Sequence, residues 1–310
     1  MPKDINIVIV GSLNIDLVTT SKRFPDEGET IIGDDFKKYP GGKGANQAVA
    51  AVRLGGRVSI IGCVGEDLHG HQIKKDLMKE NIDINSVFTV KGINTGIALI
   101  STANKQNKIT VIPGANYHLN TRMIQDSKEK IKQADIVLLQ LEIPMSIISE
   151  VIKIAVTERI PVILNPAPAK TLPNSILSGV SFITPNDVEL SLLTKTTLNT
   201  SDDYKHAINK LHNRGISNVI VTRGQYGVLF SKGECLTHIK SNKVDVLDTT
   251  GAGDTFNGAL AVALADDKEL SEAIEYANIA AALSTTKEGA QTGMPFENEV
   301  EAYKNESALK

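Results

Sequence analysis

The sequence has little of what would tie it to disulfide bonds or aromatic ligands. Tryptophan is absent, aromatic residues make up 4% of the chain, and only two cysteines occur among 310 residues. Cys63 and Cys235 lie far apart and lack the short spacing of a zinc site, so both are expected to be small core residues. With few aromatic rings, a ligand is expected to be held by hydrogen bonds and backbone groups rather than by stacking.

An excess of charge of one sign is also missing. Lys and Arg number 33 against 36 Asp and Glu, a net charge of -3, so the chain has no basic excess to attract nucleic acid or an anionic membrane. No run approaches the roughly 20 apolar residues of a membrane-spanning helix. The first residues lack the apolar stretch of a signal peptide. These absences favour a cytoplasmic enzyme or binding protein that has neither nucleic acid nor a membrane as a partner.

Apolar residues make up 41% of the chain and charged residues 22%, which is typical of a globular protein. At about 150 residues per domain, the length suggests two domains or one large α/β domain with additions. Continuously apolar runs predict strands buried on both faces of a parallel sheet, at 5–10, 58–64, 136–141, 162–164, 182–184 and 219–222. Helical patterns lie between them, at 47–54, 72–80, 122–133, 146–156, 204–212 and 256–264. This alternation predicts a three-layer α/β sandwich with a mainly parallel central sheet.

Two segments interrupt the alternation. Residues 13–39 and 93–112 are typical of paired strands joined by turns, with no helix between them. We expect both segments to form one small sheet beside the main domain. Such a sheet could serve as a lid, and an edge structure or a dimer contact is an equally good interpretation. The tail after Phe296 has the pattern of a last amphipathic helix.

The strongest local signal is the stretch 248–258, DTTGAGDTFNG. Gly251, Ala252 and Gly253 are small enough for backbone N–H groups to converge at a helix start, where an anion is stabilised. Asp254 follows in the first turn, and beside a bound phosphate it could act as a general base for an attacking hydroxyl. Alternatively, Asp254 is a helix N-terminal acid, a common feature that stabilises by about 0.3–1 kcal/mol.

A second signal is GGKGANQ at 41–47. It is not a P-loop, because no Ser or Thr follows the lysine to hold magnesium. Its glycines allow the backbone to approach a ligand closely, and Asn46 could either cap the following helix or bind a hydroxyl group. At the end of the first strand, Asn14 and Asp16 could bind vicinal hydroxyls, although a turn would also explain Asn14. Further polar residues follow the strands at 139–142, 184–189 and 221–224, so polar side chains gather at one edge of the sheet.

With these motifs, the sequence resembles the ribokinase-like (PfkB) family of sugar and nucleoside kinases over nearly its whole length. GGKGANQA at 41–48 and DTTGAGDTFNGA at 248–259 are similar to the two signatures of that family. Five further segments match in family order: GSLNIDL near the start, PGAN at 113–116, LNPAPA at 164–169, TPNDVE at 184–189 and KEGAQ at 287–291. The resemblance implies one kinase domain over 1–310, with a β-sheet lid formed by about 13–39 and 93–112.

The resemblance also implies an activity: transfer of the γ-phosphate of ATP to the 5-hydroxyl of D-ribose. Asp254 would be the base, and the N–H groups of Ala252, Gly253 and Asp254, which follow Gly251, would form the anion hole. The positions that match the family's sugar site are Asn14, Asp16, Gly42, Lys43, Gly44, Ala45, Asn46, Glu142 and Asp254.

For ATP, the resemblance implies a further set of residues, and it implies two cations. Asn186 and Glu189 would arrange magnesium and phosphate through water. The rest of the ATP set is Thr222, Arg223, Gly224, Gln225, Tyr226, Gly227, Gly253, Asp254 and Asn278. Relatives often have His where this chain has Asn278. A potassium ion would be held, mainly by carbonyl oxygens, at Asp248, Thr250, Ser284, Lys287, Gly289 and Gly293, where relatives often have Ser at the last position.

Other functions stay open at this point. A different substrate within the family, such as deoxyribose, fructose or a nucleoside, is the nearest alternative to ribose. A sugar sensor without catalysis would lack the base or the anion hole, and GAGD is intact. Because the predicted lid is an exposed sheet and relatives pair through it, we also expect a homodimer.

Overall fold

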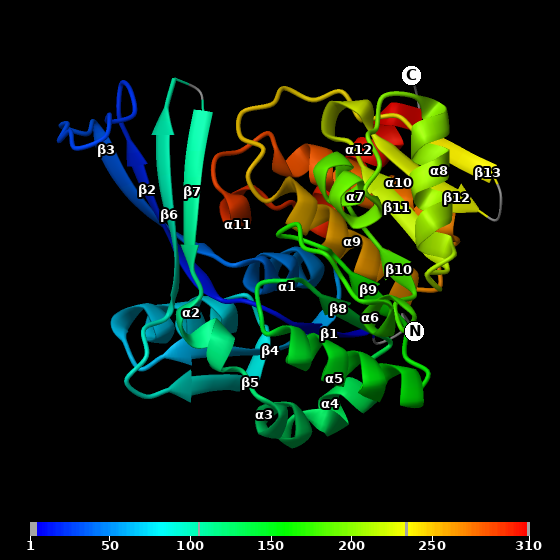
Figure 1. The fold of residues 1–310 in the computed structure, drawn as a ribbon, viewed down its shortest axis with the longest axis horizontal. Helices are drawn as coiled ribbons and strands as arrows, with labels where there is room; N and C mark the ends of the chain where they lie inside the picture. Colours follow the sequence, from blue (N-terminus) through cyan, green and yellow to red (C-terminus); the bar gives the residue numbers. More distant parts are fainter. Residues whose placement is uncertain (1–4, 105, 233–234, 309–310) are drawn as a thin grey trace.

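The computed structural model describes residues 5–104, 106–232 and 235–308. A nine-stranded sheet forms the centre, in the order β13-β12-β11-β10-β9-β8-β1-β4-β5 (Figure 1). Its strands pair in parallel from β5 across to β11, and β12 and β13 extend it antiparallel at one edge. The bounds are β1 (Asn6–Val10), β4 (Arg57–Gly65), β5 (Asp83–Val90), β8 (Ile136–Leu139), β9 (Val162–Leu164), β10 (Phe182–Ile183), β11 (Asn218–Thr222), β12 (Val228–Lys232) and β13 (Cys235–Ile239).

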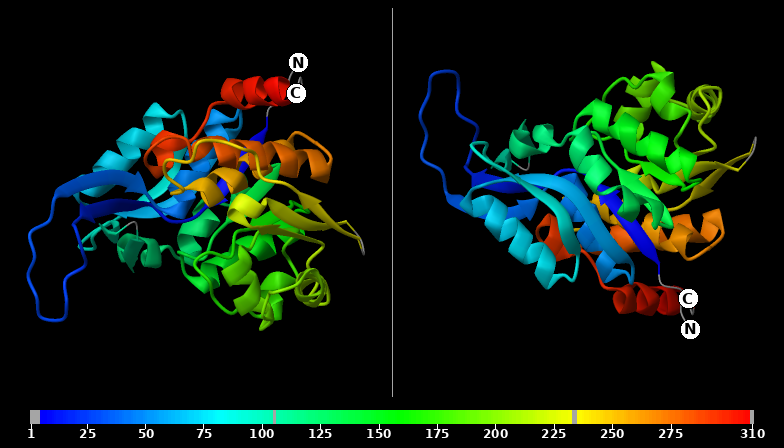
Figure 2. Two further views of the ribbon diagram at one scale, coloured as in Figure 1. Left: turned by 90° about the horizontal axis from the view of Figure 1, so that it is seen from above. Right: turned by 90° about the horizontal axis from the view of Figure 1, so that it is seen from below.

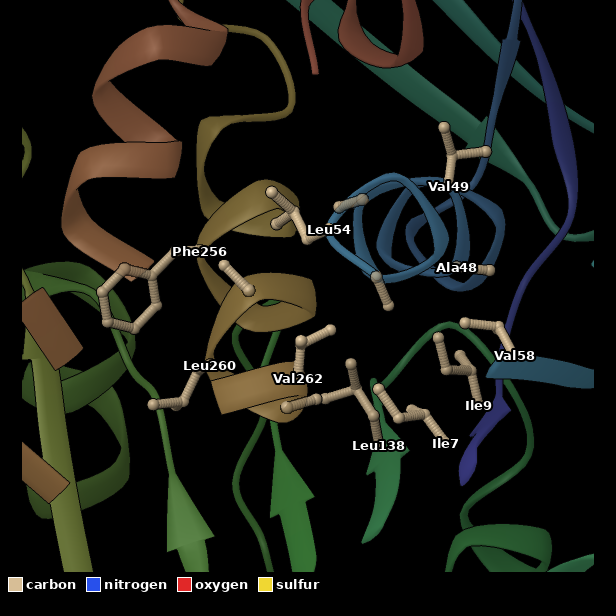
Figure 3. Packing of buried hydrophobic residues seen from close by; sticks show 14 of the residues in the cluster. Ile7, Ile9, Ala48, Val49, Leu54, Val58, Leu138, Phe256, Leu260 and Val262 are labelled. Carbon is tan, nitrogen blue, oxygen red and sulfur yellow. The ribbon is translucent and has the colours of Figure 1, made fainter. Parts of the chain in front are cut away.

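Helices cover both faces of this sheet, as the continuously apolar strands require. Ile7 and Ile9 of β1 pack on one face against α1 and α9 (Figure 3). The same core includes residues of α10 and α12. Val8 and Val10 point to the opposite face, into a core shared with α3 to α8. The three-layer arrangement predicted from the sequence is therefore confirmed. Figure 2 shows that α12 returns the chain to the side of the molecule where β1 begins.

The helices alternate with the strands along most of the chain. Their bounds are α1 (Lys43–Arg53), α2 (Leu68–Lys79), α3 (Thr121–Asp126), α4 (Lys128–Lys132), α5 (Met145–Thr157), α6 (Asn174–Leu177), α7 (Asp187–Thr194), α8 (Ser201–His212), α9 (Ala252–Ala265), α10 (Leu270–Ser284), α11 (Ala290–Gly293) and α12 (Glu297–Ala308). Short 3-10 turns lie at Gly114–His118 and Gly224–Tyr226. Among the described residues, no helix is both long enough and apolar enough to cross a bilayer.

A second sheet projects from the body at the left of Figure 1, in the order β3-β2-β6-β7. It is built from both segments that were expected to form paired strands, and its bounds are β2 (Asn14–Thr20), β3 (Asp35–Gly41), β6 (Gly96–Ala103) and β7 (Gln106–Ile112). Two antiparallel hairpins join through the parallel pair β2 and β6, in register from Asn14 with Gly96 to Thr20 with Thr102. Segments about 80 residues apart in the chain thus share one sheet.

Some predicted elements have different limits in the structure. The single helix expected at 122–133 is wrong: α3 ends at Asp126 and α4 starts anew at Lys128. Ser127 lies between them, and its backbone N–H donates to the carbonyl oxygens of Met123 and Ile124, which closes the first helix. The strand expected to reach residue 141 ends at Leu139, so Gln140 and Leu141 leave the ladder.

Candidate active site

Asp254 lies in the first turn of α9. Gly251, the N-cap of this helix, has a φ of 79°, and a Cβ there would come within 3.0 Å of Ala290. Only glycine adopts this conformation without strain, so it lets the chain turn sharply into the helix. The side chain of Asp254 is buried, with 7% of its surface exposed. The predicted base is therefore an internal group rather than a solvated helix-terminal acid.

Backbone N–H groups are available at the same helix start. The N–H of Ala252 donates to the carbonyl oxygen of Thr249 at 3.3 Å. Among the described residues, the N–H groups of Gly253 and Asp254 have no such partner, and a Cβ on Gly253 would meet nothing within 4 Å. Two of the three donors expected for the anion hole are thus unpaired at the positive end of a helix, where an anion is stabilised.

The start of α1 is pressed against the end of β1. Gly42 has a φ of 87°, and an added Cβ would lie 2.7 Å from the backbone nitrogen of Asn14. A Cβ at Gly44 would lie 2.7 Å from backbone atoms of Gly11 and Ser12. The glycines of this motif therefore let two backbone segments pack closely against each other, while the expected approach to a ligand stays a prediction. The N–H of the buried Ala45 donates to the carbonyl oxygen of Ser12 at 3.0 Å, which fixes the contact.

Asn14 and Asp16 lie two residues apart on β2 and so share one face of the small sheet. The structure places Asn14 within a strand rather than in a turn. Asn116 holds the Asn14 side chain by donating from Nδ2 to its Oδ1 at 2.7 Å, and accepts at Oδ1 from the backbone N–H of Leu13 at 2.8 Å. Among the described residues, none donates a hydrogen bond to the carboxylate of Asp16. Its carboxylate is thus available to a ligand.

The charged groups of the site influence one another. Burial raises the pKa of Asp16 to about 7, the carboxylates of Glu142 and Asp254 add to the effect, and Lys43 opposes it. Lys43 has a raised pKa in turn, chiefly because Asp254, and then Glu142, favour its charged form. Glu142 is held at Oε2 by the hydroxyl of Ser12 and, at 3.3 Å, by the backbone N–H of Lys43. One ammonium group therefore lies within a cluster of carboxylates.

Asn186 and Glu189 form a capping box at the start of α7. Asn186 Oδ1 accepts from the backbone N–H of Glu189 at 2.9 Å, and Glu189 Oε2 accepts from the backbone N–H of Asn186, also at 2.9 Å. Burial raises the pKa of Glu189, while the hydrogen bond from Asn186 and the charge of Lys43 oppose the shift. The two residues expected at the magnesium site thus have a structural task in the helix as well.

The predicted nucleotide loop follows β11. Thr222 forms an isolated parallel β-bridge with Asn186, which brings the loop next to the capping box. Gly227 has a φ of 79°, and a Cβ there would lie 2.1 Å from the carbonyl oxygen of Ile239. Asn278 of α10 donates to the carbonyl oxygen of the next residue, Lys240, at 2.7 Å. The segment at 239–240 therefore connects the loop with Asn278.

Other members of the nucleotide set lie on the same loop. Gly224, Gln225 and Tyr226 form a 3-10 turn, and the carbonyl oxygen of Gln225 accepts from the hydroxyl of Ser241 at 2.6 Å. The guanidinium of Arg223 lies 4.3 Å from the centre of the Tyr204 ring and pairs with Asp187 at 3.4 Å. Tyr226 is 59% exposed, and the guanidinium of Arg223 lies 5.5 Å from the centre of its ring.

The residues expected at the potassium site lie on the segments before α9 and α11, at the end of α10 (Ser284) and at the end of α11 (Gly293). Asp248 accepts at Oδ1 from the N–H and hydroxyl of Thr250, and at Oδ2 from the N–H of Gly289 at 2.9 Å. Burial favours the neutral form of Asp248, but these hydrogen bonds outweigh it and lower its pKa. Asp248 therefore ties the two segments together.

Carbonyl oxygens converge on Gly293. A Cβ at this position would lie 2.5 Å from the carbonyl oxygen of Ser284 and 3.4 Å from that of Lys287. A serine at this position would not fit without a shift of its surroundings. Among the described residues, no three His, Cys, Asp or Glu side chains are grouped as a metal site.

Several polar residues of the site were missed as functional candidates. Gln47, Asn116, Asn165 and Gln291 are buried, and each forms a hydrogen bond with another polar side chain of the site. All four stand within sequence segments that match the family, and that position was the only signal available. Their partners lie 102 to 245 residues away along the chain, so only the fold reveals what they do.

With this geometry in view, comparisons with known proteins define the class. The family model "pfkB family carbohydrate kinase" matches residues 4–297. The chain belongs to this family, and its ribokinase-like fold agrees with the motifs.

Particular relatives are similar over nearly their full length. A ribokinase of Bacillus subtilis (strain 168) is 42% identical over 296 residues, which cover 96% of this chain and 98% of the relative. A deoxyribokinase of Salmonella typhi is 34% identical, with 96% and 98% covered. The solved structure of Arabidopsis thaliana ribokinase complexed with ribose and ATP matches with a TM-score of 0.92 at 35% identity, covering 97% of this chain and 98% of that one.

Proposed function

We propose that this protein is an ATP-dependent ribokinase that transfers the γ-phosphate of ATP to the 5-hydroxyl of D-ribose. The observation that carries the proposal is the buried Asp254 beside two free backbone N–H groups at the start of α9. A base and an anion site are thus adjacent, as phosphoryl transfer to a hydroxyl requires. Similarity to ribokinases at about 40% identity supports ribose as the acceptor.

In this mechanism Asp254 accepts the proton of the 5-hydroxyl as the hydroxyl oxygen bonds to the γ-phosphorus, and the bond from that phosphorus to the bridging oxygen of ATP breaks, so that ADP leaves. The N–H groups of Gly253 and Asp254, with that of Ala252 completing the anion hole, stabilise negative charge on the transferred group. Lys43, held among carboxylates, is suited to approach the same phosphate. A sheet that covers the sugar would exclude water and so prevent wasteful hydrolysis of ATP.

The sugar hydroxyls would be bound from two sides. The carboxylate of Asp16 and the amide of Asn14 would approach from the small sheet, which acts as the lid. Asn46, Glu142 and the backbone around Gly42 would approach from the main domain. A full set of hydroxyls satisfies these groups best, because a buried polar group without a partner costs about 1–3 kcal/mol. The similarity to a deoxyribokinase makes deoxyribose the substrate to compare directly.

ATP would lie along the loop at 222–227, with Asn278 bordering the base. Among the described residues there is no cluster of acidic or histidine ligands, so magnesium would be carried by the phosphates and by water near Asn186 and Glu189. When bound, magnesium supplies positive charge that neutralises the phosphates. Asn186 already donates hydrogen bonds to both oxygens of Glu189. Contact with magnesium through water fits this arrangement.

A monovalent cation, potassium by preference, would be held between the segments before α9 and α11. The carbonyl oxygens of Ser284 and Lys287 that converge on Gly293 suit a hard cation, as does the carboxylate of Asp248. When bound, it would add positive charge near the start of α9. Thr250 and Gly289, both hydrogen-bonded to Asp248, would shape this site.

The enzyme would act in the cytoplasm, where ATP is available, and as a homodimer. Ile109 and Val111 of β7 are 55% and 43% exposed, and both share a face of the small sheet with Asp16. A second copy covering this face would bury their side chains. Light scattering should give twice the mass of the 33.3 kDa chain, and Ile109→Lys should give the single mass. A single-chain mass for the unmodified protein would contradict the dimer.

The function is tested by measuring ADP release with a panel of pentoses, hexoses and nucleosides, with and without potassium. We expect D-ribose to be the best acceptor. Asp254→Asn should lower kcat by at least ~100-fold, as expected for loss of a general base, with little effect on sugar affinity. Asp202→Asn is the matched control, because Asp202 also lies in the first turn of a helix but on an exposed surface. Turnover near that of the unmodified enzyme in Asp254→Asn would refute the assignment.

A further inference from the structure

Both oxygens of Asp254 are held by consecutive residues of α1. Asn46 donates from Nδ2 to Oδ2 at 2.9 Å, and Gln47 donates from Nε2 to Oδ1 at 3.0 Å. A carboxylate only accepts hydrogen bonds, so each amide must turn its NH2 group toward Asp254 and its carbonyl oxygen away. The charge of Asp254 thus dictates the orientation of both amides.

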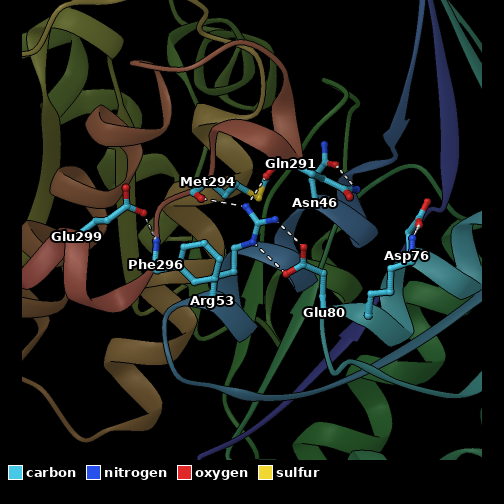
Figure 4. Close-up of polar contacts among 9 residues, drawn as sticks. Asn46, Arg53, Asp76, Glu80, Gln291, Met294, Phe296 and Glu299 are labelled. Carbon is cyan, nitrogen blue, oxygen red and sulfur yellow. Dashed lines mark hydrogen bonds and ion pairs between the residues drawn. The ribbon is translucent and has the colours of Figure 1, made fainter.

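Each outward carbonyl oxygen meets the NH2 group of a glutamine from elsewhere in the chain. Gln291 of α11 donates to Asn46 Oδ1 at 3.0 Å (Figure 4). Gln140, which follows β8, donates to Gln47 Oε1 at 2.5 Å. If either inner amide were reversed, two oxygens would face each other and two NH2 groups would do the same. The outer glutamines therefore prevent the inner amides from turning over.

Gln47 is held most completely. It has no exposed surface, and the same Nε2 group also donates to Asn165 Oδ1 at 3.2 Å. Both of its N–H bonds and its carbonyl oxygen are thus occupied by other side chains. On the other oxygen of Asp254, the outer glutamine is anchored through its backbone: Arg53 donates to the carbonyl oxygen of Gln291 at 2.6 Å (Figure 4).

We propose that Gln47 is a positioning residue for Asp254, an inference that rests on Asp254 being the base of the proposed kinase. One donor on each oxygen fixes the plane of the carboxylate and leaves a second lone pair on each for the substrate hydroxyl. The position of the Asp254 carboxylate matters, because moving a catalytic group by about 1 Å can lower the rate about a hundredfold. Gln140 and Gln291 act one step further out, through Gln47 and Asn46.

The pair Asn46 and Gln291 differs from the pair Gln47 and Gln140 in its other contacts. Asn46 is also a candidate sugar ligand, so a fault in Gln291 affects both sugar binding and the base. Gln47 and Gln140 contact other buried side chains and are not among the sugar candidates. Loss of either should therefore lower kcat and leave the KM for the sugar unchanged. A residue needed only for folding would not produce this separation.

The test replaces each glutamine with methionine, which has a similar size and cannot form these hydrogen bonds. We expect Gln47→Met to lower kcat at least about tenfold with a sugar KM within about twofold of the original. Gln140→Met should act in the same direction but less strongly. Gln72→Met is the matched control, because Gln72 also donates to an aspartate, Asp76, at 2.8 Å, but on the exposed face of α2. It should leave kcat unchanged.

A second experiment does not depend on Gln47→Met folding. Gln291→Met is combined with Asn46→Ala, and kcat/KM is measured for both single variants and the double variant. If Gln291 acts through Asn46, the double variant should be within about twofold of Asn46→Ala alone. If the loss of kcat/KM in the double variant instead equals the product of the losses in the two single variants, Gln291 does not act through Asn46.

The outcomes separate the inference from the proposed function. Full turnover in Asp254→Asn would remove the base itself. Loss of turnover in Asp254→Asn together with a normal kcat in folded Gln47→Met and Gln140→Met would leave the kinase assignment intact and refute the positioning role. Thermal unfolding of every variant identifies those that have lost their structure rather than their alignment.

Discussion

Affinity for the sugar should fall about tenfold when the pH is lowered from 8 to 6, because Asp16 loses its charge in that interval. The pKa of this carboxyl is raised to about 7, first by burial and then by the neighbouring carboxylates of Glu142 and Asp254, against the opposing effect of Lys43. An ordinary aspartate would stay ionised throughout this range. The effect is therefore specific to this buried position.

The magnitude follows from the pKa. With a pKa near 7, about nine tenths of the Asp16 groups are ionised at pH 8 and about one tenth at pH 6. Only the ionised form can accept hydrogen bonds on both oxygens from two sugar hydroxyls. The dissociation constant should vary inversely with the ionised fraction, which gives about a tenfold change. Because bound hydroxyls favour the charged form, binding should also release a proton near pH 7.

The assay is calorimetric titration of D-ribose into nucleotide-free protein between pH 5.5 and 8.5. Asp16→Asn should bind more weakly and show no dependence on pH in this range. A wild-type affinity that stays constant, or an equal slope in Asp16→Asn, would refute the reasoning.

Stability of the sugar-free protein provides a second measurement. The folded pKa of Asp16 lies above the unfolded value, so its contribution to the free energy of unfolding is present below about pH 4 and is lost as the pH rises through 7. Between pH 5 and pH 8, the melting temperature should therefore fall more in the unmodified protein than in Asp16→Asn.

Three further substitutions test the geometry around the site. Gly96→Ala should raise the sugar KM about tenfold or more in ADP-release assays, because a Cβ there would lie 2.1 Å from Asn14 Oδ1. Gly33→Ala is its control, because the atom nearest to an added Cβ there is 3.4 Å away. Gly293→Ala should lower the free energy of unfolding by about 1–3 kcal/mol and weaken potassium activation, because its Cβ would crowd a carbonyl oxygen at 2.5 Å; unchanged denaturant midpoint and activation would contradict this. Lys37→Ala should leave the urea denaturation midpoint almost unchanged, because its ion pair with Glu288 is largely solvated; a clear loss of stability in that titration would contradict this.

Much of the main domain could be predicted from the sequence, for a physical reason. A parallel sheet buried on both faces needs continuously apolar strands, and runs such as Val58–Val64 have that pattern. Glycine-rich helix starts were equally visible, because close approach of two backbones excludes a side chain. Edge strands were harder: β5 has a mixed burial pattern and was not predicted.

The rest of the site depends on contacts between distant parts of the chain. Gln47 and Asn165 lie in recognisable segments, yet nothing in either segment shows that they meet across 118 residues. The capping box of Asn186 and Glu189 is different, because their N-x-x-E spacing is a known sign of a helix start and could have been predicted. That spacing fits both a helix cap and an indirect metal contact.

The packing of α1 on α9 links the core to the chemistry. A Cβ at Gly258 of α9 would lie 2.7 Å from the Cβ of Ala50 and 2.8 Å from the carbonyl oxygen of Gln47, so small residues let the two helices meet closely. Asn46 and Gln47 are carried by one helix and Asp254 by the other. Their hydrogen bonds can form only at this separation of the helix axes. The alanine and glycine content of the two helices is therefore a requirement of the site as much as of the core.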